Sequence, residues 1–393
     1  MTVDTRRLLL IALERNAPYT NKRRGSMMVK GQRRSSLGFP LTEEQRSVFA
    51  DAQGGGAKAV CFFNNKGGVG KTTLVANLGA QLSLDFGAKV LLVDCDPQCN
   101  LTQYALGEEK ALEVYSESDP KTVFSIIRPL ALGKGYSSEL PLVKPEKFGF
   151  DLVIGDPRLA LQEDLLAQDW RDAKAGGMRG LQTTFVFLDL LKKASKLQYD
   201  FVLFDMGPSL GAINRSILLA VDFFVVPMAI DIFSIWAIRN IGQTVAVWQR
   251  ELKAGMSIAE DPSELPDLDK RDQLKFLGYV TQQHKERGAV AQNTNLAEDG
   301  SASTKKIVLA YQEINKNIPA EISKSLASFY DATKLDPHLG EIRHLGSLAP
   351  MSQSQNTPLF NVAAGGSYIQ LRKQARELYR DIATKFLRNI TMA

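Results

Sequence analysis

The sequence predicts an α/β protein with a doubly wound, mostly parallel β-sheet and helices on both faces. Short apolar runs recur along the chain without alternating polar residues, which is typical of strands buried on both faces. Helical stretches lie between successive runs. Strands that alternate with helices in this way indicate βαβ units and therefore a parallel sheet.

The apolar runs give the expected strands, and the stretches between them give the expected helices. The strands are predicted at residues 59–63, 90–93, 152–154, 201–204, 223–226 and 276–280. The helices include residues 72–86, 181–196 and 233–251. Another helix is expected after Thr42, because Thr42 and Gln45 have the spacing of a capping box.

Charge and composition divide the chain into two parts. Residues 1–40 hold nine Lys and Arg against Asp4 and Glu14, a net +7, whereas the whole chain carries +5. We therefore expect residues 1–56 to be a basic N-terminal extension, partly flexible with short helices. Residues 57–393 are expected to be the domain, with insertions near 256–272 and 293–306. The basic arm is compatible with contact to nucleic acid or an anionic membrane, and equally with a solvated tail.

Several classes of protein are excluded by composition. No apolar run approaches the roughly 18 residues that span a bilayer, and the first 40 residues lack a secretory signal, so we expect a cytoplasmic protein. The three cysteines, Cys61, Cys95 and Cys99, form no CxxC pair, which argues against a disulfide framework or a zinc site. A redox role for Cys95 and Cys99 beside an acidic motif stays open, next to a role as small buried hydrophobes.

The last 25 residues predict an amphipathic helix. Its apolar stripe at helical spacing consists of Leu371, Leu378, Ile382, Phe386 and Ile390, while its other faces carry an excess of Lys and Arg. Packing against the domain and insertion into a membrane surface are both compatible with this pattern.

The stretch "NNKGGVGKTTL", residues 64–74, predicts a phosphate-binding loop between the first strand and a helix. Such a loop points backbone N–H groups and the positive end of a helix dipole at phosphate oxygens, and its lysine, here Lys71, reaches the β- and γ-phosphates. Asn65 stands where the usual pattern has its first glycine, but Gly70, Lys71 and Thr72 follow the pattern. Lys66 is a second lysine that this chemistry leaves unexplained.

Acidic residues follow two of the predicted strands. Asp205 in "FVLFDMGPSLG" and the pair Asp94 and Asp96 in "VLLVDCDPQCN" lie at strand ends. Carboxylates there face the crevice above a parallel sheet, where phosphoryl transfer needs a metal ion and a positioned water. We expect Thr72 and Asp205 to serve Mg²⁺. For Asp94 and Asp96, water positioning and plain strand-end capping are both open.

Four stretches, "KGGVGKTT", "VLLVDCDPQCN", "DMGPSLG" and "DFFVVP", resemble in order and spacing the motifs of the ParA/MinD (Soj-like) family of deviant Walker-A ATPases. The late segment 348–360 is similar to the family's segment before its final helix. The resemblance covers about residues 58–390 and implies a P-loop NTPase fold. The chain departs from the family at Gly207, where proline is common, at Cys99, where glycine is common, and at Thr281, where an adenine-contacting asparagine is expected.

The resemblance also implies residue roles. Lys66 would reach across a nucleotide-sandwich homodimer to the partner's phosphates, and Asp96 would help to activate water. ATP would be bound by Gly67, Gly68, Val69, Gly70, Lys71, Thr72 and Thr73, with Mg²⁺ held by Thr72 and Asp205. ATP would then join the dimer, and hydrolysis would release it.

For the biological role, the resemblance implies an ATPase switch that binds DNA without sequence preference in its ATP state. It would associate with the nucleoid and be stimulated by a ParB-like partner or cargo adaptor. Candidate DNA contacts are Arg239, Arg372, Lys373 and Arg376. A membrane-associated positioning ATPase of MinD type and a P-loop biosynthetic ligase are the alternatives. Iron–sulfur carriers of the superfamily need cysteines well beyond the loop, and none follows Cys99.

Overall fold

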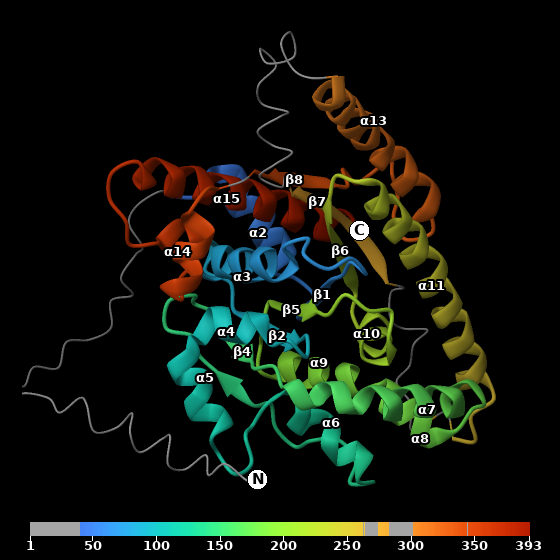
Figure 1. Ribbon diagram of the computed structural model, residues 1–393. Helices are drawn as coiled ribbons and strands as arrows, with labels where there is room; N and C mark the ends of the chain where they lie inside the picture. The colour runs from blue at the N-terminus through green and yellow to red at the C-terminus, as the bar shows by residue number, and fades with distance from the viewer. Residues whose placement is uncertain (1–39, 262, 264–273, 283–301, 344) are drawn as a thin grey trace, which may run out of the picture. The chain divides into compact units, whose positions relative to one another are not determined.

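A single eight-stranded sheet organises the chain (Figure 1). The computed structural model describes residues 40–261, 263, 274–282, 302–343 and 345–393, without the side chains of 302–312. The residues from Pro40 onward belong to one unit. The predictions for residues 1–39, and residues 262, 264–272 and 293–301 of the two expected insertions, lie outside the described residues.

The strand order is β3-β4-β2-β5-β1-β6-β7-β8, and every neighbouring pair is parallel except β3 and β4. The strands are β1 Lys58–Phe62, β2 Val90–Cys95, β3 Leu142–Val143, β4 Asp151–Val153, β5 Phe201–Met206, β6 Phe223–Ala229, β7 Lys275–Gln282 and β8 His338–Ile342. The carboxyl ends of β1, β2 and β5 therefore meet at one edge of the sheet, and the loops that follow them share a crevice.

Helices cover both faces of the sheet. The α-helices are α2 Glu43–Ala52, α3 Lys71–Gln81, α4 Asn100–Leu106, α5 Glu108–Tyr115, α6 Val123–Ala131, α7 Glu163–Lys174, α8 Met178–Thr184, α9 Val186–Lys196, α10 Ala212–Leu218, α11 Ile232–Ser257, α13 Ala302–Ser325, α14 Leu348–Ser354 and α15 Tyr368–Met392. The described residues also include a π-helix, η1 Leu82–Phe86, and two 3₁₀ helices, η2 Pro157–Gln162 and η5 Leu359–Asn361.

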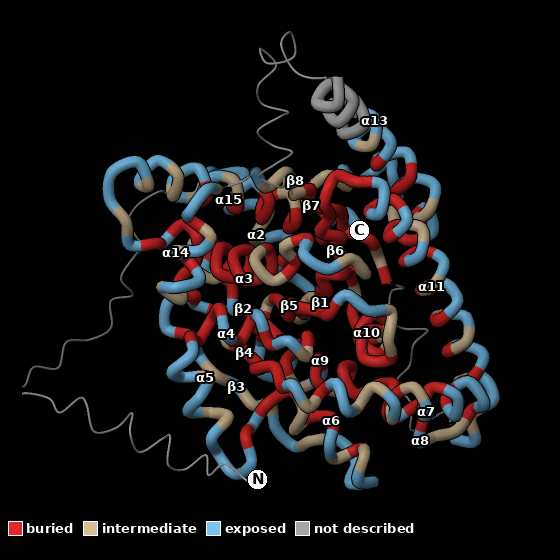
Figure 2. Tube along the Cα trace, in the orientation of Figure 1, coloured by how far each residue is buried: buried red, intermediate tan, exposed pale blue. Residues whose placement is uncertain are grey.

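The core has two layers, one on each side of the sheet. One layer packs side chains of α6 to α11 and α13 against the strands, and the other packs α2, α3, α4, α14 and α15. β1, β2, β5 and β6 are buried almost throughout (Figure 2). Their uninterrupted apolar runs are explained by this burial on both faces.

All six predicted strands are present, and among the described residues two further strands, β3 and β8, were missed. β3 has only two residues, and β8, with the sequence HLGEI, contains a glycine and polar residues because it lies at the edge of the sheet. The helix predicted at 181–196 is divided at Phe185 into α8 and α9. The capping box of Thr42 and Gln45 is confirmed at the start of α2.

The apolar stripe of α15 lies in the core. Ile382, Phe386 and Ile390 are buried, and Leu371 and Leu378 are partly buried against the same layer. The packing interpretation of this helix is therefore confirmed. Within the described residues, none of the helices combines the length and hydrophobicity that crossing a bilayer requires.

Candidate functional site

The glycine-rich loop connects the end of β1 to the first residue of α3. Gly68 and Gly70 have φ of 71° and 70°, a region that favours glycine. Gly70 also lies against the side chain of Gln282, which donates from Nε2 to its carbonyl oxygen at 3.1 Å, so a Cβ at this position would collide with that amide. These contacts direct the loop into the N-terminus of α3, as a phosphate-binding loop requires.

Lys71 is buried at the first position of α3. Its Nζ donates to the carbonyl oxygens of Asn64 at 3.3 Å and Lys66 at 3.2 Å. Burial lowers the pKa of Lys71, while the negative charges of Asp205 and Asp96 act in the opposite direction. A buried ammonium held by the loop's own carbonyls is preorganised for a phosphate, because its position is fixed before the ligand arrives.

Asp205 and Asp94 lie side by side at the carboxyl ends of β5 and β2, where they are register partners. Asp205 is fully buried, and neither carboxylate oxygen has a hydrogen-bond partner of normal geometry within the described residues. Burial and the charge of Asp94 raise the pKa of Asp205, against the nearby Thr72 hydroxyl and Lys71. A buried carboxylate without partners is unfavourable unless a cation or proton joins it.

Asp94 and Asp96 have different hydrogen-bond partners. Asp94 accepts hydrogen bonds from the backbone N–H of Thr102 at 2.8 Å and from its hydroxyl at 2.7 Å, so it joins β2 to α4. Asp96 lies two residues further on and lines the pocket beside the glycine-rich loop. Its Oδ1 accepts from the N–H of Gln98 at 3.0 Å. Strand-end capping therefore describes Asp94, and Asp96 is the member of this pair that lines the pocket.

The residues present fit a magnesium ion. Among the described residues there is no group of three or more His, Cys, Asp or Glu that forms an all-protein metal site. Mg²⁺ is usually held by one or two protein oxygens together with phosphates and waters. Thr72 and the unpartnered oxygens of Asp205 supply such a donor set next to the phosphate-binding loop.

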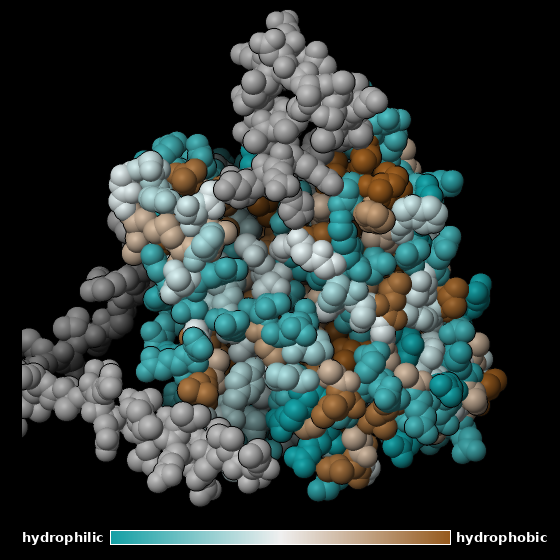
Figure 3. Space-filling view, viewed as in Figure 1, coloured by the Kyte–Doolittle hydropathy of each residue, from teal (hydrophilic) through white to brown (hydrophobic). Residues whose placement is uncertain are grey.

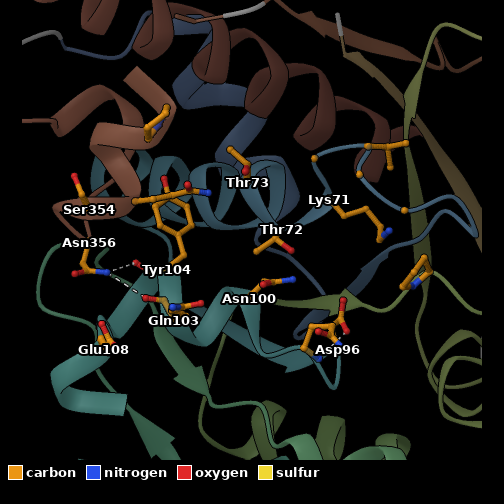
Figure 4. A pocket seen from close by; sticks show the side chains of 18 residues that line it. Lys71, Thr72, Thr73, Asp96, Asn100, Gln103, Tyr104, Glu108, Ser354 and Asn356 are labelled. Atoms are coloured by element: carbon orange, nitrogen blue, oxygen red, sulfur yellow. Dashed lines mark hydrogen bonds between the residues drawn. The ribbon is translucent and has the colours of Figure 1, made fainter. Parts of the chain in front are cut away.

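A pocket of about 870 Å³ extends from the loop across α4 to α14. Lys71 and Asp96 lie on one side, and Gln103, Tyr104 and Asn356 lie on the other (Figure 4). Asn356 donates from Nδ2 to the carbonyl oxygens of Gln103 and Tyr104, each at 3.1 Å, and so joins α14 to the C-terminal end of α4. The pocket offers more room than a triphosphate alone needs, and its polar far wall is suited to a nucleoside.

The side chain of Lys66 has different partners from that of Lys71. Its Nζ forms an ion pair with Oδ2 of Asp231, the residue that precedes α11, and lies 5.7 Å from the centre of the Phe233 ring. Its backbone N–H donates to Oδ1 of the fully buried Asn64 at 2.9 Å. The two lysines of the loop therefore face different surroundings.

Three of the four candidate DNA-binding residues have partners inside the chain. Arg239 forms two 2.7 Å hydrogen bonds with Glu321. Arg372 donates to the carbonyl oxygen of Val362 at 2.7 Å, and Arg376 donates at 2.9 Å to Asp85, whose side chain is buried. The fourth, Lys373, is exposed.

Sequence reasoning did not identify several residues that shape the site. Asn64 anchors the loop through a 2.7 Å hydrogen bond to the carbonyl oxygen of Pro227, and Asn214 holds the segment after Asp205. Gln282 and Asp231 come from the ends of β7 and β6. Gln282 and Asp231 follow predicted strands whose carboxyl ends meet at the crevice. This position is the feature of the sequence that could have identified them.

Comparison with known proteins gives consistent matches. The family model described as an AAA domain matches residues 57–258. The chain is 30% identical over 201 residues to the chromosome-partitioning ATPase Soj of Treponema pallidum, covering 51% of this chain and 68% of that protein. It is also 30% identical over 203 residues to the sporulation initiation inhibitor protein Soj of Bacillus subtilis, covering 51% of this chain and 70% of the relative.

Solved structures share the fold. A protein from Corynebacterium diphtheriae has a TM-score of 0.60 at 29% identity, covering 76% of this chain and 97% of the other. The structure of pnob8 ParA has a TM-score of 0.54 at 21% identity, covering 85% and 97%.

Proposed function

The chain belongs to the ParA/MinD family of P-loop ATPases, and on that basis we propose that it is an ATP-dependent dimerising switch that binds DNA in its ATP state. The observation that carries the ATPase part is the placement of Asp205. Its carboxylate at the end of β5 is buried beside Lys71 and Thr72 of the phosphate-binding loop, and the described residues give it no hydrogen-bond partner of normal geometry. Such an arrangement is favourable once a cation and phosphate arrive.

Each group of residues in the site has its own role in ATP hydrolysis. The backbone N–H groups of residues 67–73 bind the phosphates, and the Lys71 ammonium neutralises charge on the β- and γ-phosphates. Thr72 and Asp205 would hold a Mg²⁺ ion, which would neutralise charge on the phosphates. Asp96 faces the same pocket and orients the attacking water. Each group acts by position and charge, as phosphoryl transfer requires.

Dimerisation is supported by the surface next to the loop. Ile232, Phe233 and Trp236 at the start of α11 are 49%, 67% and 54% exposed, and Phe233 lies beside Lys66. Apolar surface is visible where α11 begins (Figure 3). Neighbouring exposed apolar side chains favour a protein contact. We infer that two chains meet at this surface with ATP between them and that Lys66 of each contacts the other's phosphates.

Fewer described residues support DNA binding than support ATP binding. Lys373 is the exposed candidate, and the basic extension at residues 1–56 adds positive charge. Contacts of this kind bind phosphates without reading sequence and weaken steeply with salt. We propose that the ATP-bound dimer associates with the nucleoid in this way and that a ParB-like partner or cargo adaptor stimulates hydrolysis.

The proposal is tested by measuring ATP turnover with and without duplex DNA across a salt series, together with light scattering. We expect ATP-dependent dimers, and DNA binding that needs ATP and falls with salt. Monomers at saturating ATP and Mg²⁺, or DNA binding indifferent to nucleotide, would contradict it. Co-sedimentation with anionic vesicles tests the MinD-like alternative, which requires the packed stripe of α15 to leave the core. Product formation from a small acid would instead indicate a P-loop ligase.

A further inference from the structure

A network of buried hydrogen bonds joins α3, α4, α14 and the residues that follow α14. The side-chain amide of Asn77 in α3 donates to the hydroxyl of Tyr104 in α4 at 3.1 Å. That hydroxyl lies 2.5 Å from the hydroxyl of Ser352 in α14, which donates to the carbonyl oxygen of Thr357 at 2.5 Å. Asn77 Oδ1 in turn accepts from the backbone N–H of Leu359 at 2.8 Å. Three distant parts of the chain therefore share one network.

The distances assign the donor of each hydrogen bond. The carbonyl oxygen of Thr357 lies 2.5 Å from the hydroxyl of Ser352 but 3.4 Å from that of Tyr104, so Ser352 donates to it and Tyr104 donates to Ser352. Asn77, Tyr104, Ser352 and Thr357 are each at most 5% exposed. A satisfied network in the protein interior fixes its members, because each lost contact leaves a buried polar group without a partner.

α4 connects this network to the acid that lines the pocket. The carbonyl oxygen of Asp96 accepts from the backbone N–H of Cys99 at 2.8 Å, and the carbonyl oxygen of Cys99 accepts from that of Gln103 in α4 at 3.0 Å. At the other end of α4, the side chain of Asn356 donates to the carbonyl oxygens of Gln103 and Tyr104 (Figure 4). A shift of α4 would therefore move Asp96.

We propose that Tyr104 is a positioning residue that holds α4, and with it Asp96, at a fixed place relative to the phosphate-binding helix α3. This inference rests on the proposed function, because it assumes that Asp96 orients the attacking water. It makes hydrolysis depend on Ser352, which lies 248 residues further along the chain. Tyr104 also lines the pocket, but the partners of its hydroxyl are buried, so the hydroxyl acts through α4 and not on the nucleotide.

The variant Tyr104→Phe removes only the hydroxyl. The ring keeps its neighbour Phe148, whose ring centre lies 5.2 Å away. We expect kcat for ATP hydrolysis to fall about tenfold, because a small displacement of a group that orients water lowers the rate steeply. The dissociation constant of ATP, measured by titration of the monomer, should stay unchanged. Weaker ATP binding with an unchanged kcat would show that Tyr104 contacts the nucleotide and would overturn the inference.

Tyr199→Phe is the matched control. Tyr199 is 4% exposed, and its hydroxyl donates to Oδ2 of Asp151 at 2.8 Å. Tyr199 precedes β5 and Asp151 begins β4, so this contact lies at the amino ends of the strands, at the opposite edge of the sheet from the pocket. Thermal unfolding should show a loss of stability in both variants, with kcat lowered only in Tyr104→Phe. An equal fall of kcat in the control would mean that lost stability alone is responsible.

Ser352→Ala removes the partner of Tyr104 on α14 and should lower kcat in the same way. We expect the double variant of Tyr104→Phe and Ser352→Ala to be no slower than the slower single variant, because both changes remove the same contact. Effects on kcat that multiply in the double variant would show that the two residues act independently, contrary to the inference.

Hydrogen exchange of the nucleotide-free protein gives a measurement that does not depend on hydrolysis. Residues 96–106 should exchange faster in Tyr104→Phe and Ser352→Ala than in the parent chain or in Tyr199→Phe, because α4 opens more often when its contact to α3 and α14 is lost. Unchanged exchange in this segment, or an unchanged kcat in Tyr104→Phe, would overturn the inference and leave the proposed ATPase intact. A parent chain that binds ATP without hydrolysing it would overturn both.

Discussion

The side-chain amide of Asn214 donates a 2.8 Å hydrogen bond to the carbonyl oxygen of Gly207. The same nitrogen donates to the carbonyl oxygen of Ser209 at 2.6 Å, and Asn214 is 2% exposed. One buried residue of α10 thus holds the loop that follows Asp205. A Cβ at Gly207 would lie 3.5 Å from Oδ1 of Asp96, which places this loop against the acid that faces the pocket.

Asn214→Ala should lower kcat for ATP hydrolysis more than it changes KM. The change frees the loop beside Asp96 but leaves the phosphate-binding residues in place. The buried carbonyl oxygen of Gly207 also loses this donor, which costs about 1–3 kcal/mol of folding stability, and the part-buried contact to Ser209 is lost with it. Steady-state kinetics and thermal unfolding measure the two effects.

Ser216→Ala is the control for Asn214→Ala. Ser216 is buried on the same helix and donates only to the carbonyl oxygen of Ala212, at 3.1 Å, so its loss tests stability without touching the loop. An unchanged kcat in Asn214→Ala, after correction for the folded fraction, would show that the loop does not depend on this amide.

Asp96→Ala should allow ATP binding and dimerisation but slow hydrolysis, so that an ATP-bound dimer accumulates. The variant removes the pocket-facing carboxylate, whereas Asp94 keeps its hydrogen bonds to Thr102. Loss of a catalytic base or water-positioning group typically costs about 10²- to 10⁴-fold in rate. Phosphate release and light scattering after addition of ATP measure both effects. Undiminished phosphate release would remove Asp96 from the mechanism.

The central sheet was predictable because its strands carry their own signal. β1, β2, β5 and β6 are buried on both faces and therefore contain no alternating polar residues. β8 lies at the edge of the sheet, where it pairs only with β7, and most of its residues are half-exposed. Its sequence HLGEI therefore resembles that of a loop. The strand register, which places Asp94 beside Asp205, depends on contacts between distant segments. Sequence spacing alone does not determine it.

The candidate site was predictable where a backbone conformation demands a residue type. Gly70 has both a positive φ and a close neighbour in Gln282, so glycine marks the loop in the sequence. Asn64 and Asp231 contact residues far along the chain, Asn64 through a hydrogen bond to Pro227 and Asp231 through an ion pair with Lys66. Asparagine and aspartate are common in loops for many reasons, and their partners appear only once the fold brings them together.

Lys66→Ala and Lys71→Ala should have different consequences. Lys71 is buried under the loop and lines the pocket, so its loss should abolish nucleotide binding to the monomer. Lys66 points to Asp231 instead, so Lys66→Ala should bind ATP normally yet fail to form ATP-dependent dimers. A fluorescent nucleotide titration and light scattering separate these outcomes. Persistent dimers in Lys66→Ala would refute the role of Lys66 across the interface.

Of the candidate DNA contacts on α15, we expect Lys373 to bind DNA and Arg376 to stabilise the fold. Lys373 is exposed, so Lys373→Ala should weaken binding of the ATP-bound dimer to any duplex. The salt dependence of binding should also become less steep, by about one unit of log–log slope for each DNA phosphate that the lysine no longer neutralises. The thermal stability of the variant should not change.

Arg376 is the matched comparison for Lys373. It shares the buried Asp85 with Arg380, at 2.9 Å and 2.7 Å, and the Asp85 side chain is fully buried. Because Arg380 still pairs with Asp85, we expect Arg376→Ala to cost about 1–3 kcal/mol of stability, less than a fully broken buried pair. Equal effects of both variants on DNA binding at equal stability would contradict this division.

The cysteines should be unreactive in the folded protein, which tests the redox role that the sequence left open. Cys61, Cys95 and Cys99 are all buried, and burial raises the pKa of each thiol, that of Cys99 to about 12. Since the thiolate is the reactive form, Cys99 at pH 8 should react about three orders of magnitude more slowly than a free cysteine. At pH values below that pKa, each increase of one pH unit should raise the reaction rate of Cys99 about tenfold, because it raises the thiolate fraction tenfold.

Ellman's reagent measures the reaction rate of the thiols in native buffer, and unfolding in guanidinium should then make all three thiols react at once. Rapid native labelling, or ATPase activity that responds reversibly to mild oxidants, would show that one of these thiols is accessible and would restore the redox interpretation.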